Sequence, residues 1–195
     1  MTDTLWAPWR MKWIAGVSAK RGASRAAASK AQESPKQCLF CRVAKSTADR
    51  RDLVLARRPQ AMLMLNRYPY ASAHLMVAVR RHAARFVELD AAERSDLLEL
   101  VALAERALEL EYRPDGVNYG LNVGKVAGAG FPGHLHMHLV PRWNGDTNFM
   151  PVIAHTRVLP ESLAAMWGRL RKRIAKLEPS RGGGVARNAR GVRRG

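Results

Sequence analysis

The chain has 195 residues, enough for one compact domain with a sizeable core. Hydrophobic residues make up 47% of it and charged residues 25%, which excludes a collagen-like or wholly disordered protein. The formal net charge is +17, so the surface should attract phosphates, nucleotides or nucleic acid. Residues 1–36 and 181–195 carry +5 each and the segment between them +7, so more than half of the charge lies in the two ends.

The N-terminal region divides into an aromatic arm over 1–16 and a flexible basic linker over 17–36. Three tryptophans lie in the arm, whereas the linker is rich in Ala, Ser, Lys and Arg without apolar periodicity. The linker resembles an organelle transit peptide in composition, but the aromatic density before it favours a packed arm. No apolar run in the sequence approaches the ~20 residues of a membrane span, and the sparse cysteine content favours a reducing cytoplasm.

The main domain is predicted over 37–178 and has an α+β pattern. Short β-prone runs separated by turn residues predict about five antiparallel strands in a meander-like sheet. These runs cover 53–56, 61–65, 73–79, 117–123 and 134–140. Pro141 is expected to end the last strand.

Two main helices accompany the strands. Asp90 followed by Glu93 predicts a capping box at the start of a helix that ends before Pro114. A second helix fits 161–177, with basic residues near its end. The following segment, 179–195, is an Arg/Gly-rich tail that is disordered by composition.

The segment 134–140 carries the strongest chemical signal. His134, His136 and His138 alternate with apolar residues, so a strand would project all three imidazoles from one face. A Gly-rich loop with glycines at 124, 128, 130 and 133 precedes them. The three histidines could hold a metal with an open water position, or one could act as a nucleophile that its neighbours orient. The loop favours the nucleophile, because its backbone N–H groups can converge on phosphate oxygens.

The sequence HLHMHLV resembles the signature of the histidine triad family, whose members hydrolyse or transfer the α-phosphate of nucleotide conjugates. NRYPY at 66–70, HLMV at 74–77 and the Arg81–His82 pair extend the resemblance over most of 38–155. LWAPWRM near the N-terminus and PRWNGDTNF after the histidines are similar to the bacterial branch of diadenosine tetraphosphate phosphorylases, or ATP adenylyltransferases.

The resemblance implies a role for each matching residue. His136 would attack the α-phosphorus to give a nucleotidyl-histidine intermediate, and His138 would hydrogen-bond the phosphate or leaving group. Asn66 would bind the ribose, and His74 would support the pocket wall or be only a satisfied core histidine. The groups expected to hold phosphate oxygens are Asn122 and the backbone from Gly128 to Gly130.

A second implied site uses the C-x-x-C pair. By itself this pair fits a zinc half-site, a redox pair or chance. In the family, similar cysteines join two histidines around structural zinc, which here implies the ligands Cys38, Cys41, His82 and His134. Such a site would leave His136 and His138 for chemistry.

Two positions depart from the family pattern. Gly130 stands where many relatives have Gln or Ser, which removes one candidate for positioning the leaving group or attacking water. Ala73 stands where Gly is usual. The missing polar side chain at position 130 bears on the rate and on the choice between hydrolysis and phosphorolysis.

The expected function is phosphorolysis of diadenosine tetraphosphate to ADP and ATP. A hydrolase of dinucleoside polyphosphates or nucleoside phosphoramidates is the alternative within enzymes, and a metal-dependent hydrolase using three histidines is a third. A basic nucleic-acid-binding module is the alternative of another class, although the tail lacks interleaved aromatics. The resemblance also implies a homodimer, with the N-terminal arm and 143–149 as candidates for its interface.

Overall fold

The computed structural model describes residues 34–146 and 160–178. The predicted aromatic arm, almost all of the basic linker and the Arg/Gly-rich tail lie outside the described residues. Of the predicted interface segment 143–149, residues 143–146 are described, and Trp143 is half-buried there.

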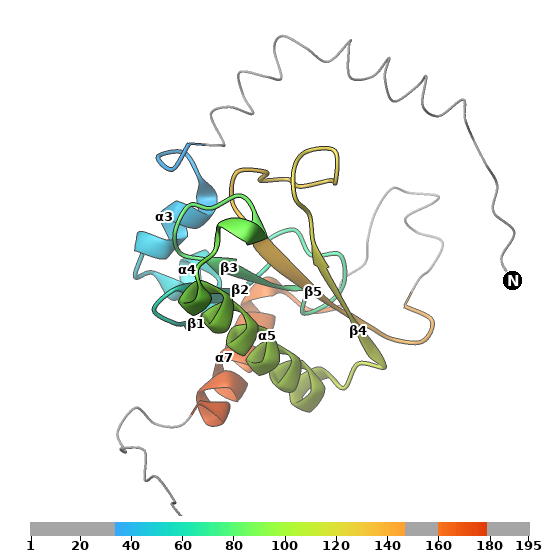
Figure 1. Ribbon diagram of the computed structural model, residues 1–195. Helices are drawn as coiled ribbons and strands as arrows, with labels where there is room; N and C mark the ends of the chain where they lie inside the picture. The colour runs from blue at the N-terminus through green and yellow to red at the C-terminus, as the bar shows by residue number, and fades with distance from the viewer. Residues whose placement is uncertain (1–33, 147–159, 179–195) are drawn as a thin grey trace, which may run out of the picture.

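A five-stranded antiparallel sheet forms the centre of the fold (Figure 1). Its spatial order is β1-β2-β3-β5-β4. The strands are β1 (Val54–Arg57), β2 (Ala61–Leu65), β3 (Leu75–Val79), β4 (Gly116–Leu121) and β5 (His136–Arg142). The first three strands form the expected meander, but β5 inserts between β3 and β4. The α+β prediction is confirmed, and the histidine strand is an interior strand of the sheet.

Helices lie on both sides of this sheet. The helical elements are α3 (Leu39–Lys45), α4 (Asp49–Asp52), the 3-10 turn η1 (Phe86–Glu88), α5 (Ala91–Tyr112) and α7 (Leu163–Leu177). Figure 1 shows α5 and α7 together on one side of the fold and α3 on another. The two long helices match the predicted ones, whereas α3 and α4 are additions that the sequence did not predict.

Local side-chain bonds fix the start of α5. The Asp90 carboxylate accepts from the Glu93 N–H at 2.8 Å, and the Glu93 carboxylate accepts from the Asp90 N–H at 3.0 Å. This is the predicted capping box, which satisfies two backbone donors at the helix start. Arg81 adds a two-pronged ion pair to Glu93, with both N···O distances at 2.7 Å. The turn before α5 is thereby tied to its first helical turn.

The strand alternation divides the interior into two clusters. Odd-numbered residues such as Leu63 and Val77 pack under α5 and α7 in the larger cluster. Even-numbered residues such as Met62 and Met76 pack with Phe40 of α3 in the smaller one. Because side chains alternate between the faces of a strand, this division places His136 and His138 on the α3 side.

The end of the histidine strand was predicted wrongly. Pro141 lies inside β5, paired with Val117, and the strand continues to Arg142. The Arg142 carbonyl accepts from the Asp115 N–H on the β4 side, so the proline nitrogen faces the other edge. The pairing with β3 ends there at Leu139, and the missing N–H therefore interrupts no ladder bond.

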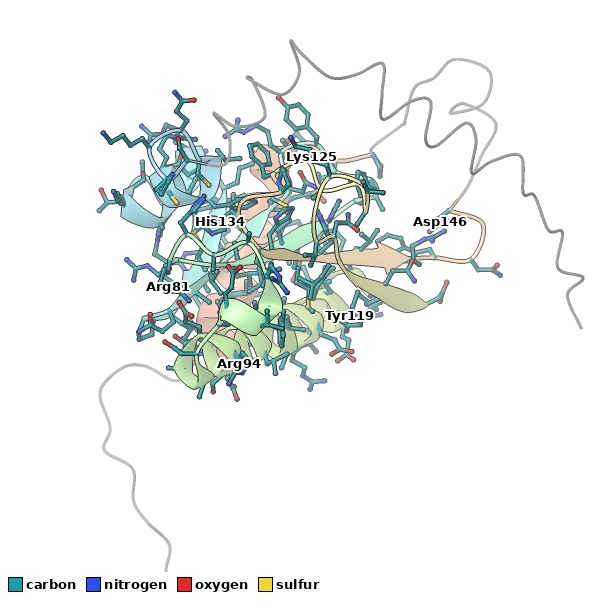
Figure 2. All side chains as sticks on the ribbon, turned by 45° about the horizontal axis from the view of Figure 1, so that its top comes forward. Arg81, Arg94, Tyr119, Lys125, His134 and Asp146 are labelled. Carbon is teal, nitrogen blue, oxygen red and sulfur yellow. The ribbon has the colours of Figure 1, made fainter. Side chains whose placement is uncertain are left out.

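The start of this strand also differs from the prediction. His134 precedes β5 instead of belonging to it, and its N–H bonds to the Phe131 carbonyl. His134 and Asp146 mark opposite ends of the β5 segment in Figure 2. None of the helices within 34–146 and 160–178 has the length and apolar character needed to cross a membrane.

Candidate active site

A cavity of about 390 Å³ opens between α3, the sheet and the Gly-rich loop. This volume is near the lower end of the range for small-molecule sites, about 300–1,000 Å³. His136 and His138 line it together with apolar side chains such as Phe40, Leu53 and Met64. A cavity with an apolar wall and a few converging polar groups suits a flat aromatic ligand with a polar extension.

His136 is held so that one ring nitrogen keeps its lone pair. Its Nδ1 lies 2.8 Å from the His134 carbonyl oxygen, which only accepts, so the proton of the neutral ring belongs on Nδ1. Phe40 stacks on the imidazole with ring centroids 4.7 Å apart and planes 30° apart. The unprotonated Nε2 of a ring fixed in this way is a potential nucleophile.

His138 is oriented by the neighbouring strand. The fully buried His74 accepts at Nδ1 from the Tyr70 N–H at 3.1 Å and from the Asn66 side-chain amide at 3.3 Å. Its proton therefore belongs on Nε2, which donates to Nδ1 of His138 at 2.9 Å. The neutral His138 then carries its own proton on Nε2.

The two site histidines thus have opposite tautomers. Their ring centroids lie 4.9 Å apart, so one acceptor nitrogen and one N–H donor come from adjacent rings. Desolvation by burial lowers the pKa of His136, and it lowers the pKa of His138 to about 4 with the help of the neighbouring His136. Both rings are neutral near pH 7, as a nucleophile and a hydrogen-bond donor of this kind require.

The four predicted metal ligands lie together. Cys38 Sγ is 3.3 Å from His134 Nδ1, and Cys41 Sγ is 3.2 Å from His82 Nδ1 and 3.6 Å from His134 Nδ1. All four ligand atoms lie within 4.8 Å of one another. Tetrahedral zinc with ordinary bond lengths separates sulfur and nitrogen ligands by about 3.5 Å, so the donor set and its spacing fit zinc.

A backbone contact supports this assignment. His134 Nε2 lies 2.8 Å from the Val79 carbonyl, so this nitrogen donates and Nδ1 faces the sulfurs as a lone pair. Metal-binding histidines are typically fixed by such a bond from the other ring nitrogen. Within the described part of the chain this is the only group of three or more His, Cys, Asp or Glu placed to hold a metal. The three-histidine metal site is therefore not formed.

The remaining predicted site residues divide into two groups. Asn66, Gly128 and Gly130 line the cavity, and the Gly128 N–H already donates to the Lys125 carbonyl at 3.0 Å. Asn122 directly follows β4 and is not among the described residues that line the cavity. Figure 2 shows Lys125 on the Gly-rich loop.

Phe40 is a site residue that the sequence analysis missed. It is 1% exposed, lines the cavity and lies on α3 between the two cysteines. The only available signal was its position within the C-x-x-C pair, whose interpretations concerned the cysteines and not the residues between them. Phe40 connects the cysteine cluster to the ring of His136.

Comparisons with known proteins agree with this geometry. The HIT domain family model matches residues 48–145. An AP-4-A phosphorylase of Mycobacterium tuberculosis is 37% identical over 159 residues, which are 82% of this chain and 77% of the relative. The adenosine 5'-monophosphoramidase hnt1 of Schizosaccharomyces pombe is 26% identical over 137 residues, 70% of this chain and 98% of the relative. A crystal structure of a zinc-bound histidine triad family protein from Mycobacterium smegmatis shares the fold, with a TM-score of 0.58, 20% identity, and coverage of 74% of this chain and 97% of that one.

Proposed function

The chain belongs to the HIT family, and from this premise we propose that it transfers a nucleotidyl group from diadenosine tetraphosphate to inorganic phosphate, giving ADP and ATP. The observation that carries the proposal is the pair of contacts, His136 Nδ1 to the His134 carbonyl and His138 Nδ1 to His74 Nε2, which leaves an acceptor Nε2 on His136 beside a donor Nε2–H on His138. The likeness to the mycobacterial phosphorylase supports the choice of substrate and acceptor.

In the first step, the Nε2 lone pair of His136 attacks the α-phosphorus. A P–N bond forms, the P–O bond to the β-phosphate breaks, and ATP leaves with the bonding electrons. The modified imidazole becomes positively charged, and the His134 carbonyl that accepts from its Nδ1–H at 2.8 Å stabilises that charge. The Nε2–H of His138 hydrogen-bonds the departing oxygen or a phosphate oxygen.

In the second step, an oxygen of inorganic phosphate attacks the same phosphorus. A new P–O bond forms, the P–N bond breaks and ADP is released, so His136 recovers its lone pair. Asn66 and Gly130 both line the cavity, where Asn66 would bind the ribose and the Gly130 backbone would hold phosphate oxygens. Splitting one displacement into two gives each step a good leaving group.

We infer that Cys38, Cys41, His82 and His134 hold structural zinc. A closed set of four protein ligands leaves no open position for substrate or water, so the ion would supply folding energy rather than Lewis acidity. The four residues come from the start of α3, the turn before η1 and the segment before β5. Zinc would thus fasten α3, and with it Phe40, to the histidine strand.

The proposal includes three further expectations, on the catalytic unit, the oligomeric state and the cellular location. We infer that residues 37–178 form the catalytic unit, so that removing 180–195 leaves turnover unchanged. The enzyme is expected to be a homodimer, which light scattering after size-exclusion chromatography would test. A cytoplasmic location agrees with the two unpaired cysteines, which a reducing compartment would keep ready for metal.

The test is turnover of diadenosine tetraphosphate with and without inorganic phosphate, with ADP, ATP and AMP resolved, alongside His136→Ala. Formation of ADP and ATP that needs phosphate and is lost in the variant is the expected result. AMP with ATP, independent of phosphate, would instead identify a hydrolase on the same scaffold. If diadenosine tetraphosphate is not turned over, nucleoside phosphoramidates are the next substrates to test, because the fission yeast relative is named for that class. Nucleic-acid binding would be tested after them.

A further inference from the structure

This inference rests on the proposed function and concerns the second nucleoside of the substrate. Diadenosine tetraphosphate carries two adenosines, whereas the cavity of about 390 Å³ beside His136 has room for one nucleoside and its phosphate. The other adenosine leaves as part of ATP and must lie outside the apolar end of the cavity. The surface around the cavity mouth should therefore show where it binds.

Two tyrosines at this mouth are unusually exposed. Tyr68 is 80% exposed and Tyr70 is 54% exposed, yet both line the cavity. Large aromatic side chains normally bury most of their area, so a pair on one short turn beside a ligand cavity indicates a contact surface. Every nucleobase has a π-face that can stack on such rings.

The turn that carries the two rings is fixed at both ends. The Tyr68 N–H donates to the Asn66 side-chain oxygen at 2.9 Å, and the Tyr70 N–H donates to His74 Nδ1 at 3.1 Å. The Asn66 N–H closes the turn on the His74 carbonyl at 2.9 Å. A rigid turn loses little conformational entropy when a ligand stacks on its side chains.

The Tyr70 ring lies next to His138, which faces the leaving group in the proposed mechanism. The Tyr70 ring centroid is 4.6 Å from that of His74 and 6.1 Å from that of His138. In the proposed mechanism the Nε2–H of His138 bonds the departing oxygen or a phosphate oxygen, so the rest of the polyphosphate passes this histidine on its way to the cavity mouth, where the turn lies. Arg67, also on the cavity wall, places a cation beside that path.

We propose that Tyr68, with Tyr70 beside it, is the stacking platform for the second nucleobase of a dinucleoside polyphosphate. The platform selects substrates whose leaving group ends in a nucleoside over those that end in free phosphate. It does not take part in bond breaking.

The test compares diadenosine tetraphosphate with adenosine 5'-tetraphosphate, which has the same AMP half and the same leaving triphosphate but no second adenosine. Initial rates at saturating phosphate give KM for each compound with the wild-type protein, Tyr68→Ala and Tyr68→Phe. Tyr68→Ala should raise KM for the dinucleotide about fivefold or more, since stacking on one aromatic ring typically contributes this much. KM for the mononucleotide should stay within twofold, and Tyr68→Phe should behave as wild type.

Phe86→Ala is the matched control, because Phe86 is 36% exposed and does not line the cavity. Equal changes for both compounds in Tyr68→Ala, or no change for either, would overturn the platform while leaving the proposed function intact. If the wild-type protein turns over neither compound, the proposed function fails separately. In that case calorimetry gives the dissociation constants of the two compounds and tests the platform directly. If Tyr68→Ala leaves the ratio of these two dissociation constants unchanged, the platform proposal is overturned.

Discussion

The Nε2 atom of His74 lies 2.9 Å from the Nδ1 atom of His138, and this contact determines which nitrogen of His138 carries the proton. His74 directly precedes β3 and lies diagonally across from His138 of β5, because the adjacent Leu75 pairs with Leu139. His74 is itself oriented by two N–H donors of its own turn. The turn that precedes His74 therefore determines which nitrogen of His138 can donate into the cavity.

Replacing His74 tests this control. His74→Ala should lower kcat by about tenfold to a hundredfold with a smaller effect on KM, because His138 loses the donor that holds its tautomer. His74→Gln should recover much of kcat, since the Gln amide can donate from nearly the same position. If kcat falls equally in both variants, or if only KM changes, His74 is a core residue without a positioning role. Thermal unfolding of each variant separates positioning from folding.

The burial of His138 predicts a specific pH dependence of stability. Burial lowers its pKa to about 4 in the folded protein, whereas an unfolded chain has the ordinary value near 6.5. Between these values the unfolded state binds the extra proton, so the free energy of unfolding should fall as the pH drops from about 6.5 to 4. Urea titrations at pH 7, 6 and 5 measure the free energy of unfolding at each pH. His138→Gln should show a shallower fall, and an unchanged slope would contradict the assignment.

The cysteine cluster predicts that metal supports folding. The double variant Cys38→Ser with Cys41→Ser should lose stoichiometric zinc and unfold at lower temperature, because α3 loses its attachment to the segment before β5. Elemental analysis and thermal unfolding measure the two effects. A double variant that keeps one zinc per chain would refute the site. Brief chelator treatment of the folded wild-type protein should leave turnover intact as long as zinc stays bound.

The ion pair between Arg81 and Glu93 predicts a stability effect near the same cluster. Glu93 is 2% exposed, and the Arg81 guanidinium holds its pKa below the usual range. Arg81→Met should lower the free energy of unfolding more than the control variant below, because the buried Glu93 carboxylate loses its main partner, although Arg81 itself is half exposed. Arg106→Met, at an exposed pair with Glu109, is the control and should change stability by less than about 0.5 kcal/mol.

The sequence predicted the parts of the fold that depend on local patterns. The bounds of β2 match the predicted run 61–65, and the capping box at Asp90 forms as expected. α3 was missed because Cys38 occupies its N-cap without a side-chain cap bond, so no start signal is present. The prediction for Pro141 was wrong because a proline fits inside β5 only where the pairing with β3 has already ended, which the local sequence does not reveal.

The site could be predicted in its residue types but not in its bonds. The grouping of two cysteines with His82 and His134, and the place of His136 at the cavity, were expected from motifs, whereas the tautomers depend on contacts between strands that spacing does not reveal. Ala73 stands where the family usually has glycine, and its φ of 56° is in the left-handed region that favours glycine. The residue that carries this strain directly precedes His74.

The stacking of Phe40 on His136 gives the last prediction. Phe40→Leu preserves most of the apolar volume but removes the flat ring that lies 4.7 Å from the imidazole. We expect kcat to fall about tenfold as His136 gains rotational freedom, with a loss of about 1 kcal/mol in stability and with zinc content unchanged. Val43→Ala removes apolar area from the same cavity without touching His136 stacking, so it should raise KM and spare kcat. If both variants changed only KM, Phe40 would be a wall of the base pocket and nothing more. A fall in kcat confined to Phe40→Leu would show that α3, which begins directly after Cys38, also positions His136.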